Sequence, residues 1–539
     1  MVHLGVDAVL DLEFDALKLD VQPEFSDAEL LRQKYPAKAH ARKVAEELKI
    51  GAGHGCESGI IYIPGEPTRQ YVDSDQGPEF RQRRYFYYIT GVEYADCTVT
   101  YEVGSDTLTL WIPYIEPRQA LYYGNVPDAA RMSDMFDVDR VRYSKELPGF
   151  VAAKSNPSTT FYVLSRTQVH RVMLMAPAPD KDGDDKRPRV DWARLRPAMD
   201  RARVVKDAHE IALIRRANSI SSIAHRKVAA NLLRLGNEQD VEAIFLATCI
   251  GRGAHKQAYH IIAGSGPNAA TLHYDANDAP LRASDVLVID AGCEYRCYAS
   301  DITRSLPISG SWSRESGAIY AVVQRMQDAC IRSVRPGLRY ANLHLLAAQI
   351  ATDALLDLGI LRGPKADVHA SRVVAAFFPH GLGHHVGLEV HDVTGDDKLL
   401  TGLDVYNETY DTSSHAASRR PKLQSMSREG LISLAKDSAL HSQAHAGEVR
   451  PQLQVLQPGM IVTIEPGLYF NRDYLQGYYL SKPDIARFID TDVLQRYYPV
   501  GGVRIEDDIL VTKDGYENLT TAPKGEELLD IINGTYEFL

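Results

Sequence analysis

One short segment near the middle of the chain constrains the fold more than any other part of the sequence. Residues 286–289 form a continuous apolar run, which indicates a buried β-strand, and Asp290 ends this run in VLVIDAG. Asp301 follows eleven positions later in YASDITR, a spacing that suits two neighbouring strands joined by a short connection. Taken singly, an aspartate is more often a turn or cap residue, but burying its charge without a partner is costly. We therefore expect both carboxylates to face one point inside the fold.

The length of the chain predicts two domains, because 539 residues exceed what a single hydrophobic core usually organises. A hydrophobic content of 45% and a charged content of 24% are typical of a soluble globular protein. The net charge of −11 is spread along the sequence and argues against nucleic-acid binding, which needs a basic patch or stripe. No run of about 18 apolar residues occurs, so no membrane span is expected. The first residues lack the basic and apolar regions of a signal peptide.

The cysteines are sparse and form no familiar metal-binding pattern. Cys293 and Cys297 are close, but no Cys-x-x-Cys spacing occurs; the others are Cys56, Cys97, Cys249 and Cys330. We interpret all six as reduced thiols, in the core or at the surface, of a protein of the cytoplasm. Metal ligation by cysteine is the less favoured alternative.

Local patterns place a hairpin, a loop and a long helix in the first half of the chain. Residues 97–112 alternate apolar and polar side chains on two strands, with Gly104-Ser105-Asp106 at the turn. Residues 176–190 are polar and rich in proline, which indicates a loop or linker. Asp207, with Glu210 three residues later, is typical of a helix start, and we place the domain boundary directly before it.

Helical and strand patterns alternate from about residue 206 onward, without the Gly-rich loop that binds phosphate. Residues 393–452 differ from their surroundings, because they contain no Phe, Trp or Cys and many Ser, Asp and Gly residues. This composition predicts a surface insertion that is partly helical or disordered.

Five acidic or histidine side chains are candidate metal ligands because each lies in a tight local pattern: Asp290, Asp301, His384, Glu465 and Glu506. His384 belongs to PHGLGHHVGLEVHD, which holds four histidines within twelve residues; a His-rich surface loop is the alternative interpretation. Glu465 follows the apolar run of MIVTIEPG. Glu506 lies in GGVRIEDD close to Arg504, and such a pair usually forms a simple salt bridge.

Together these side chains suit a pair of divalent cations. Carboxylate and imidazole ligands fit Mn, Fe, Co or Zn better than copper or an iron–sulfur cluster. Two such ions can share bridging carboxylates and activate a water molecule between them. Four converging carboxylates cannot all stay ionised without cations, because like charges at short range raise one another's pKa. Metal-free chemistry at this site is therefore hard to support.

Four segments resemble the successive motifs of the Xaa-Pro peptidases, the aminopeptidase P and prolidase branch of the methionine-aminopeptidase-like superfamily: VLVIDAGCEYRCYASDITR, HGLGHHVGLEVHD, VTIEPGLY and VRIEDD. The stretch FRQRRYFYYITG at residues 80–91 is similar to the family's N-terminal part. The resemblance implies an α+β protein, with an N-terminal mixed α/β domain in residues 1–200. A pita-bread catalytic domain, a curved antiparallel sheet backed by helices, would follow in residues 206–539. The resemblance also implies a homodimer and two divalent metal ions per chain, most often Mn(II).

The order Asp, Asp, His, Glu, Glu matches the family's ligand set with no ligand missing. By this resemblance, Asp290 binds one metal ion, whereas Asp301 and Glu506 bridge both. His384 and Glu465 then bind the second ion. A bridging hydroxide would attack the carbonyl of the residue before proline, and Glu465 would also shuttle the proton.

Further residues match positions near the family's substrate: His273 in TLHY, His380, His391 and Arg504. The resemblance places His273 close to the substrate and Arg504 where it helps to position the site. His380 and His391 would contact the substrate and the tetrahedral intermediate. Imidazoles suit this task because they can stabilise an oxyanion or protonate a leaving amine.

The expected reaction is that of an Xaa-Pro aminopeptidase, which releases the N-terminal residue from peptides with proline in the second position. The amide nitrogen of proline carries no hydrogen, so a site that accepts the pyrrolidine ring in an apolar pocket would favour it. The alternative is a prolidase, which cleaves dipeptides. Prolidases carry an Arg-rich loop where this chain has the 393–452 insertion, and Arg450 matches that loop poorly. DAGCEY is closer to aminopeptidase P, whereas SKPDIARFIDTDVLQRYYPVGG has the longer form of prolidases.

Other hypotheses come from different classes. A pita-bread protein that has lost catalysis would serve as a binding module, but such relatives usually lack a ligand. A metal-free reaction resembling that of creatinase conflicts with the intact ligand set. A specialised metabolic hydrolase also stays open, because fold and metals do not fix the substrate.

Overall fold

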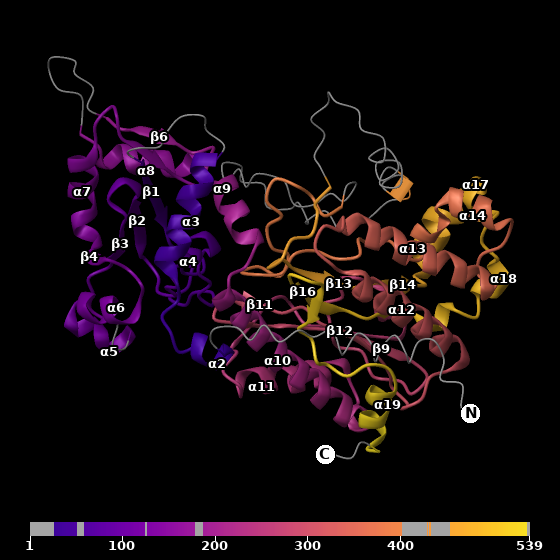
Figure 1. Ribbon diagram of the computed structural model, residues 1–539. Coiled ribbons are helices and arrows are strands. Elements are labelled where there is room, and N and C mark those ends of the chain that lie inside the picture. Colours follow the sequence, from indigo (N-terminus) through magenta and orange to yellow (C-terminus); the bar gives the residue numbers. More distant parts are fainter. Residues whose placement is uncertain are drawn as a thin grey trace, which may run out of the picture.

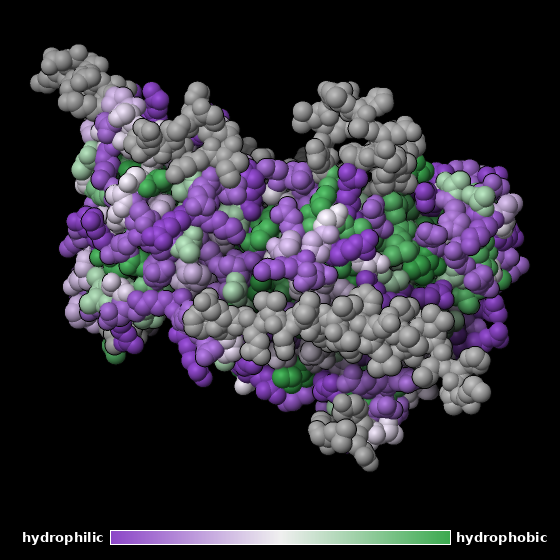
Figure 2. All heavy atoms as spheres, viewed as in Figure 1, coloured by the Kyte–Doolittle hydropathy of each residue, from purple (hydrophilic) through white to green (hydrophobic). Residues whose placement is uncertain are grey.

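The computed structural model describes residues 26–50, 59–123, 127–177, 187–400, 428, 431–432 and 453–535. Figure 1 shows two lobes, with most of the N-terminal strands and helices, coloured indigo to purple, on one side and the later elements on the other. Hydrophilic residues predominate on the face of both lobes that Figure 2 shows. The apolar side chains are accordingly gathered inside, in several contiguous clusters.

The N-terminal lobe is built on a mixed sheet of six strands in the order β4-β3-β2-β1-β5-β6. The strands are β1 (Gly59–Pro64), β2 (Thr98–Glu102), β3 (Thr107–Ile112), β4 (Arg140–Tyr143), β5 (Thr160–Tyr162) and β6 (Arg189–Asp191). The pairs β1–β2 and β2–β3 are antiparallel, whereas β3–β4, β1–β5 and β5–β6 are parallel. The helices of this part of the chain are α2 (Asp27–Leu30), which lies apart from the sheet, α3 (Ala37–Ile50), α4 (Arg84–Tyr88), α5 (Ala120–Tyr123), α6 (Ala129–Met135), α7 (Leu147–Lys154), α8 (Arg166–Met175) and α9 (Leu195–Val204). This lobe is therefore mixed α/β, as expected from the resemblance.

The hairpin predicted for residues 97–112 is formed by β2 and β3, which pair from Thr98 opposite Trp111 to Glu102 opposite Thr107. Asp106 adopts φ 49° and ψ 45° at the turn, a left-handed conformation that aspartate visits more readily than most residues. The predicted loop 176–190 is shorter than expected, because its last two residues belong to β6 and pair with β5. Residues 178–186 of this loop lie outside the described ranges.

The helix predicted to start at Asp207 is α10 (Ala208–Asn231). The Asp207 carboxylate accepts a hydrogen bond from the backbone N–H of Glu210 at 2.9 Å. The Glu210 carboxylate accepts one from the N–H of Asp207 at 3.0 Å. This reciprocal capping satisfies N–H groups that the first helical turn leaves without partners, and it confirms the predicted helix start.

The second lobe is formed by antiparallel strands, arranged within the described ranges as the sheets β11-β10-β7, β12-β9-β8, β13-β16-β17 and β14-β15. The first strands are β7 (Lys256–Gln257), β8 (Ile262–Ser265), β9 (Val286–Asp290), β10 (Cys293–Tyr295), β11 (Tyr298–Ala299) and β12 (Thr303–Pro307). The later strands are β13 (Ile461–Ile464), β14 (Gly467–Tyr469), β15 (Gly502–Arg504), β16 (Asp507–Val511) and β17 (Tyr516–Asn518). The predicted buried strand is β9, which lies between β8 and β12 in its sheet.

The connection between Asp290 and Asp301 differs in one respect from the expectation. The neighbouring strand is indeed close, because β12 pairs with β9 and Thr303 lies opposite Asp290. The connection itself, however, contains the short hairpin β10–β11. Asp301 therefore lies just before its strand, at the exit of this hairpin.

Helices pack around these sheets (Figure 1). They include α11 (Glu238–Ile250), α12 (Arg314–Ser333), α13 (Tyr340–Asp357), α14 (Lys365–Ser371), α16 (Arg472–Tyr474), α17 (Pro483–Ala486), α18 (Thr491–Leu494) and α19 (Gly525–Asn533). A large core joins Val323 of α12 and Ala347 of α13 to Val462 of β13 and Leu468 of β14. None of the helices in the described ranges has both the length and the apolar composition that a membrane crossing requires.

A second apolar cluster joins the two lobes. It contains Val44 of α3 and Phe86 of α4 from the N-terminal lobe, together with Leu213 of α10 and Ile461 of β13. Because these residues belong to one contiguous cluster, the N-terminal lobe packs directly against the lobe that carries the site.

Most of the predicted insertion lies outside the described ranges, which include only residues 393–400, 428 and 431–432 of it. Leu431 is buried in the large core of the second lobe. The described cysteines are all buried and free, in agreement with their interpretation as reduced thiols: Cys97, Cys249, Cys293, Cys297 and Cys330. Cys56 and Arg450 lie outside the described ranges.

Candidate active site

The five predicted metal ligands line one cavity of about 430 Å³. Asp290 is the last residue of β9, and Asp301 lies two residues before β12. Glu465 follows β13, and Glu506 directly precedes β16. His384 lies in a loop that runs beside β13, where its neighbour His385 forms an isolated bridge to Val462. The cavity therefore lies where the ends of β9, β13 and β16 come together.

Backbone contacts fix the His384 loop to β13. The Thr463 N–H donates to the His384 carbonyl at 2.9 Å, and the His384 N–H donates to Thr463 Oγ1 at 3.1 Å. Gly383 permits this approach, because a Cβ atom there would lie 2.4 Å from the Thr463 carbonyl oxygen. The second glycine of HGLGHH is thus required by the close passage of two backbones.

Overlapping groups of possible ligand atoms surround the cavity. Asp290, Asp301 and Glu506 offer carboxylate oxygens that lie within 4.8 Å of one another. His384, Glu465 and Glu506 form a second group of this kind. His384 Nε2 lies 3.3 Å from Glu465 Oε1 and 3.4 Å from Asp301 Oδ2. Glu506 belongs to both groups, and Asp301 adjoins both, so these two side chains occupy the positions that bridging ligands would need.

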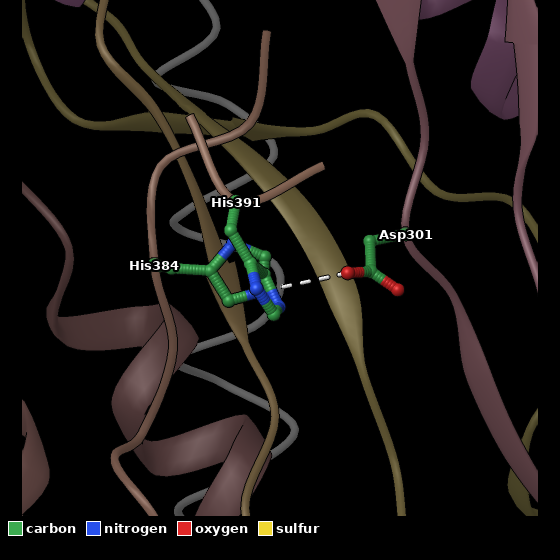
Figure 3. A group of neighbouring side chains, drawn as sticks. All are labelled: Asp301, His384 and His391. Carbon is green, nitrogen blue, oxygen red and sulfur yellow. Dashed lines mark ion pairs between the residues drawn. The ribbon is translucent and has the colours of Figure 1, made fainter. Parts of the chain in front are cut away.

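His391 is closer to these groups than the sequence indicates. Figure 3 shows the rings of His384 and His391 side by side, facing the carboxylate of Asp301. Their centroids lie 4.2 Å apart with the planes inclined at 70°. Each of the three side chains offers a ligand atom within 4.8 Å of the others. His391 can therefore reach either a metal ion or a substrate held beside it.

Arg504 and Thr303 hold two of the carboxylates. Arg504 Nη2 donates to Asp290 Oδ2 at 2.6 Å, and Arg504 Nε donates to Thr303 Oγ1 at 3.1 Å. The Thr303 hydroxyl donates in turn to Glu506 Oε2 at 2.6 Å. Arg504 is thus paired with Asp290 rather than with Glu506, its neighbour in sequence. This pairing fits the positioning role that the resemblance implies for Arg504.

Tyr259 contacts Asp290 and Asp301, and it is not among the site residues predicted from the sequence. Its hydroxyl lies 2.6 Å from Asp290 Oδ1 and 2.5 Å from Asp301 Oδ1, so it bridges the two carboxylates. Burial and the adjacent carboxylates raise the pKa of Tyr259 well above its ordinary value, which keeps the hydroxyl protonated. The surrounding AYHII contains no motif that would have identified this residue.

Tyr469 is a second hydroxyl that the sequence interpretation missed, although it ends the motif VTIEPGLY. Arg504 Nη1 donates to its oxygen at 2.8 Å. His380 Nδ1 lies 2.7 Å from the Gly381 carbonyl, which can only accept, so the His380 proton is on Nδ1. The Tyr469 hydroxyl then donates to His380 Nε2 at 2.9 Å. His380 therefore orders Tyr469 and, through it, Arg504.

Burial and mutual repulsion change the pKa values of the clustered acidic side chains. Burial, reinforced by the neighbouring carboxylates, raises the pKa of Glu506 well above its ordinary value and that of Asp301 to about 6. Burial would also raise the pKa of Glu465, but the hydrogen bond and charge of His384 outweigh it and lower this pKa to about 2. The residues fit a pair of divalent ions, because such ions would neutralise carboxylates that otherwise cannot all stay ionised.

The remaining histidines of the cavity are uncharged or exposed. Burial lowers the pKa of His380. The side chain of His391 keeps exposed surface, and partial desolvation in the cavity, followed by the charge of His384, lowers its pKa as well. Both are therefore neutral imidazoles near pH 7. His273 also lines the cavity, on an exposed part of its wall.

Asp392, next to His391, lies in a buried ion triad. Its Oδ1 accepts a hydrogen bond from Arg203 Nη2 at 2.6 Å, and its Oδ2 lies 3.1 Å from Lys206 Nζ. The three side chains are at most 2% exposed. Burial would raise the pKa of Asp392, but the two cations outweigh it and lower the pKa. Because Arg203 belongs to α9 and Lys206 precedes α10, the triad ties the segment between the lobes to the His391 loop.

Replacing Asp392 by alanine removes the carboxylate that pairs directly with two buried cations, and we expect it to destabilise the protein by ~3–5 kcal/mol. Asp396→Ala is the matched control, because its carboxylate is 64% exposed and pairs with Arg201 at 3.1 Å. The control should cost less than ~1 kcal/mol. Urea denaturation followed by circular dichroism measures both effects, and equal denaturation midpoints for the two variants would contradict a stabilising triad.

Two family models match the chain. The model of metallopeptidase family M24 matches residues 212–513, and that of the aminopeptidase P N-terminal domain matches residues 38–162. The first match alone covers more than half of the 539 residues.

Whole-chain relatives agree with these models. The chain is 52% identical to a probable Xaa-Pro aminopeptidase of Metarhizium acridum, over 98% of this chain and 99% of the relative. It is 51% identical to a probable Xaa-Pro aminopeptidase of Colletotrichum graminicola, over 97% of both chains. Among solved structures, the low pH form of Escherichia coli aminopeptidase P aligns with a TM-score of 0.71 at 24% identity, covering 93% of this chain and 99% of the other. This likeness confirms the expected α+β fold, with a mixed N-terminal domain and a pita-bread domain.

Proposed function

The chain belongs to the Xaa-Pro aminopeptidases of metallopeptidase family M24, and we propose that it works with two divalent metal ions held in the cavity. Its reaction is the metal-dependent hydrolysis of the peptide bond before a proline, which releases the N-terminal residue. The prolidase alternative has less support, because the relatives at 52% and 51% identity carry the name aminopeptidase.

The observation that carries the two-ion proposal is the clustering of carboxylates that cannot all keep their charge unaided. We assign one ion to Asp290 and the other to His384 and Glu465, with Asp301 and Glu506 shared. The support is that Glu506 lies within 4.8 Å of possible ligand atoms from either side. When bound, such a pair of ions polarises the substrate carbonyl and lowers the pKa of a water molecule.

The surrounding residues prepare this chemistry. Glu465 lines the cavity beside His384, with Oε1 3.3 Å from His384 Nε2, and we assign it to accept the proton that the attacking water loses. His391 is neutral, so its ring can donate one N–H to the oxygen on which negative charge develops. Arg504 keeps Asp290 oriented through a 2.6 Å hydrogen bond, and His380 keeps Arg504 oriented through Tyr469. His273 is proposed to contact the bound peptide from the cavity wall.

Finer properties follow as part of the same proposal. Oxygen and nitrogen ligands suit Mn(II), which we propose as the working metal. The buried free cysteines are consistent with a reducing compartment such as the cytoplasm. A homodimer rests on the family resemblance, and size-exclusion chromatography with light scattering tests it. A domain boundary between residues 200 and 206 is supported by the capped start of α10 at Asp207.

Cleavage of defined peptides tests the reaction. The purified chain, stripped by a chelator and reloaded with Mn(II), should release the first residue from Xaa-Pro-Yaa tripeptides. It should leave Xaa-Ala-Yaa peptides intact, because alanine lacks the ring that a proline pocket accepts. The stripped protein should be inactive, since its own residues supply no substitute for the polarising ions.

The same panel separates the alternatives. Cleavage of Xaa-Pro dipeptides alone would favour a prolidase. A reloaded protein that binds these peptides without cleaving any of them would favour a binding module. Equal activity before and after chelation would contradict the metal dependence.

A further inference from the structure

A buried carboxylate anchors the loop that carries His273. Glu238, the first residue of α11, has no exposed surface. Within the described part of the chain, its two oxygens accept hydrogen bonds from neutral donors. Oε1 accepts from Ser265 N at 2.7 Å, Ser265 Oγ at 2.7 Å and Asn268 Nδ2 at 3.2 Å. Oε2 accepts from Tyr274 OH at 2.8 Å and Ala279 N at 3.0 Å. Burial of a carboxylate is unfavourable unless hydrogen bonds replace its hydration, and these donors do so.

The donors lie on both arms of one loop, residues 265–279. Ser265 and Asn268 bind Glu238 from the first arm, and Tyr274 and Ala279 bind it from the second. The middle of this loop lines the catalytic cavity with Leu272, His273, Tyr274 and Asp275. The carboxylate therefore fixes both ends of a cavity wall without itself lining the cavity.

His273 is the residue of this wall most directly affected. Its neighbour Tyr274 is bound to Glu238 through the phenol, and the same hydroxyl accepts a hydrogen bond from Asn268 Nδ2 at 3.1 Å. The backbone on either side of His273 is thus tied to one buried group. An imidazole that must meet a bound peptide gains from such fixation, because small displacements of a binding group lower the rate steeply.

We propose that Glu238 is a positioning residue that acts through His273, holding it where it meets the peptide substrate. The inference rests on the proposed function of the cavity, in which His273 contacts the peptide. Glu238 does not line the cavity, and its described side-chain contacts are with the loop and not with the proposed metal ligands, so its effect must pass through the loop.

Glu238→Gln is the appropriate substitution because it keeps the size of the side chain. The amide has one oxygen, so in either orientation its NH₂ group faces a backbone N–H, that of Ser265 or that of Ala279. One arm of the loop then loses its anchor. Glu242→Gln, one turn further along α11, is the matched control: its Oε2 accepts only from Asn277 Nδ2 among the contacts described, at 3.0 Å, and an amide oxygen can keep that bond.

A double-mutant cycle with His273→Ala tests the proposal, with kcat and KM measured on an Xaa-Pro-Yaa tripeptide. Glu238→Gln should lower kcat/KM roughly 10- to 100-fold in the wild-type background. In the His273→Ala background it should change kcat/KM by less than about twofold, because the residue it positions is gone. Metal content and the Glu242→Gln control should match the wild type.

Other outcomes overturn the inference. Losses that multiply in the double variant, or an equal loss in Glu242→Gln, would mean that Glu238 does not act through His273. If Glu238→Gln fails to fold, Tyr274→Phe removes a single donor and must show the same non-additivity with His273→Ala. A wild-type protein that cleaves no Xaa-Pro peptide refutes the proposed function, and the inference falls with it; an active wild type with multiplying losses refutes the inference alone.

Discussion

Replacing Asp301 or Glu506 by alanine is expected to abolish peptide cleavage and to release metal from the protein. Glu506 lies within 4.8 Å of possible ligand atoms in two groups, and Asp301 belongs to a group with His384 as well as to that of Asp290. In the proposed two-ion site, loss of a shared carboxylate would remove a ligand from both ions and a negative charge from between them. The effect should therefore exceed that of removing a ligand of one ion only.

Loss of metal in these variants should not reflect unfolding. Burial, and after it the neighbouring carboxylates, raise the pKa of Glu506, so an ionised Glu506 is unfavourable in the metal-free protein and its removal relieves that cost. The metal-free variants should thus be at least as stable as the metal-free wild type, as measured by thermal denaturation. The control is Asp275→Ala, because Asp275 lines the same cavity outside the ligand groups. Metal analysis after gel filtration decides the matter: two ions per chain in Asp301→Ala or Glu506→Ala would contradict the bridging role.

Local sequence patterns of a few residues predict the helix and the strand next to this site. The pair Asp207 and Glu210 predicts the start of α10, because helix capping depends only on neighbouring residues. The apolar run before Asp290 predicts β9, because a strand buried on both faces needs apolar residues at every position. Neither prediction requires knowledge of which segments meet in space.

The hairpin between Asp290 and Asp301 has no such local signal. Its turn residues, Arg296 and Cys297, have φ of 47° and 66°. Turns with two positive φ values usually carry glycine or asparagine, so arginine and cysteine at these positions do not indicate one. The tertiary fold imposes this turn, and the spacing of the two aspartates alone suggested a simpler connection.

Pairing between strands that are far apart in the sequence brings the remaining site residues together. Glu465 and Glu506 reach the aspartates through the pairing of β13 with β16 and the bridge between Thr303 and Glu506. Without the family resemblance, hydrophobic periodicity could not have brought these segments together. Tyr259 shows most clearly what the sequence alone cannot predict. Its ring is compatible with an apolar segment, and only the fold reveals that its hydroxyl lies between two carboxylates.

His391→Ala is expected to leave the metal bound and to lower turnover by roughly 10²–10⁴-fold, the usual scale for a positioned acid–base or oxyanion group. The ring centroids of His391 and His384 lie 4.2 Å apart, and the pKa of His391 is lowered from its ordinary value by partial desolvation and by the charge of His384, so the ring is neutral near pH 7. A neutral imidazole beside the reacting carbonyl can donate its N–H as the oxygen gains charge.

The alternative role of His391 is that of a metal ligand, because it offers a nitrogen within 4.8 Å of ligand atoms of Asp301 and His384. The carboxylates outnumber it and carry the charge that divalent ions require, so metal retention is the expected result for His391→Ala. Metal content and kcat measured on the same preparation distinguish the roles. If His391→Ala loses an ion together with its activity, His391 is a ligand. If the variant keeps wild-type turnover, His391 contributes only to packing. A fall in kcat with both ions retained is what a group acting on the transition state must produce.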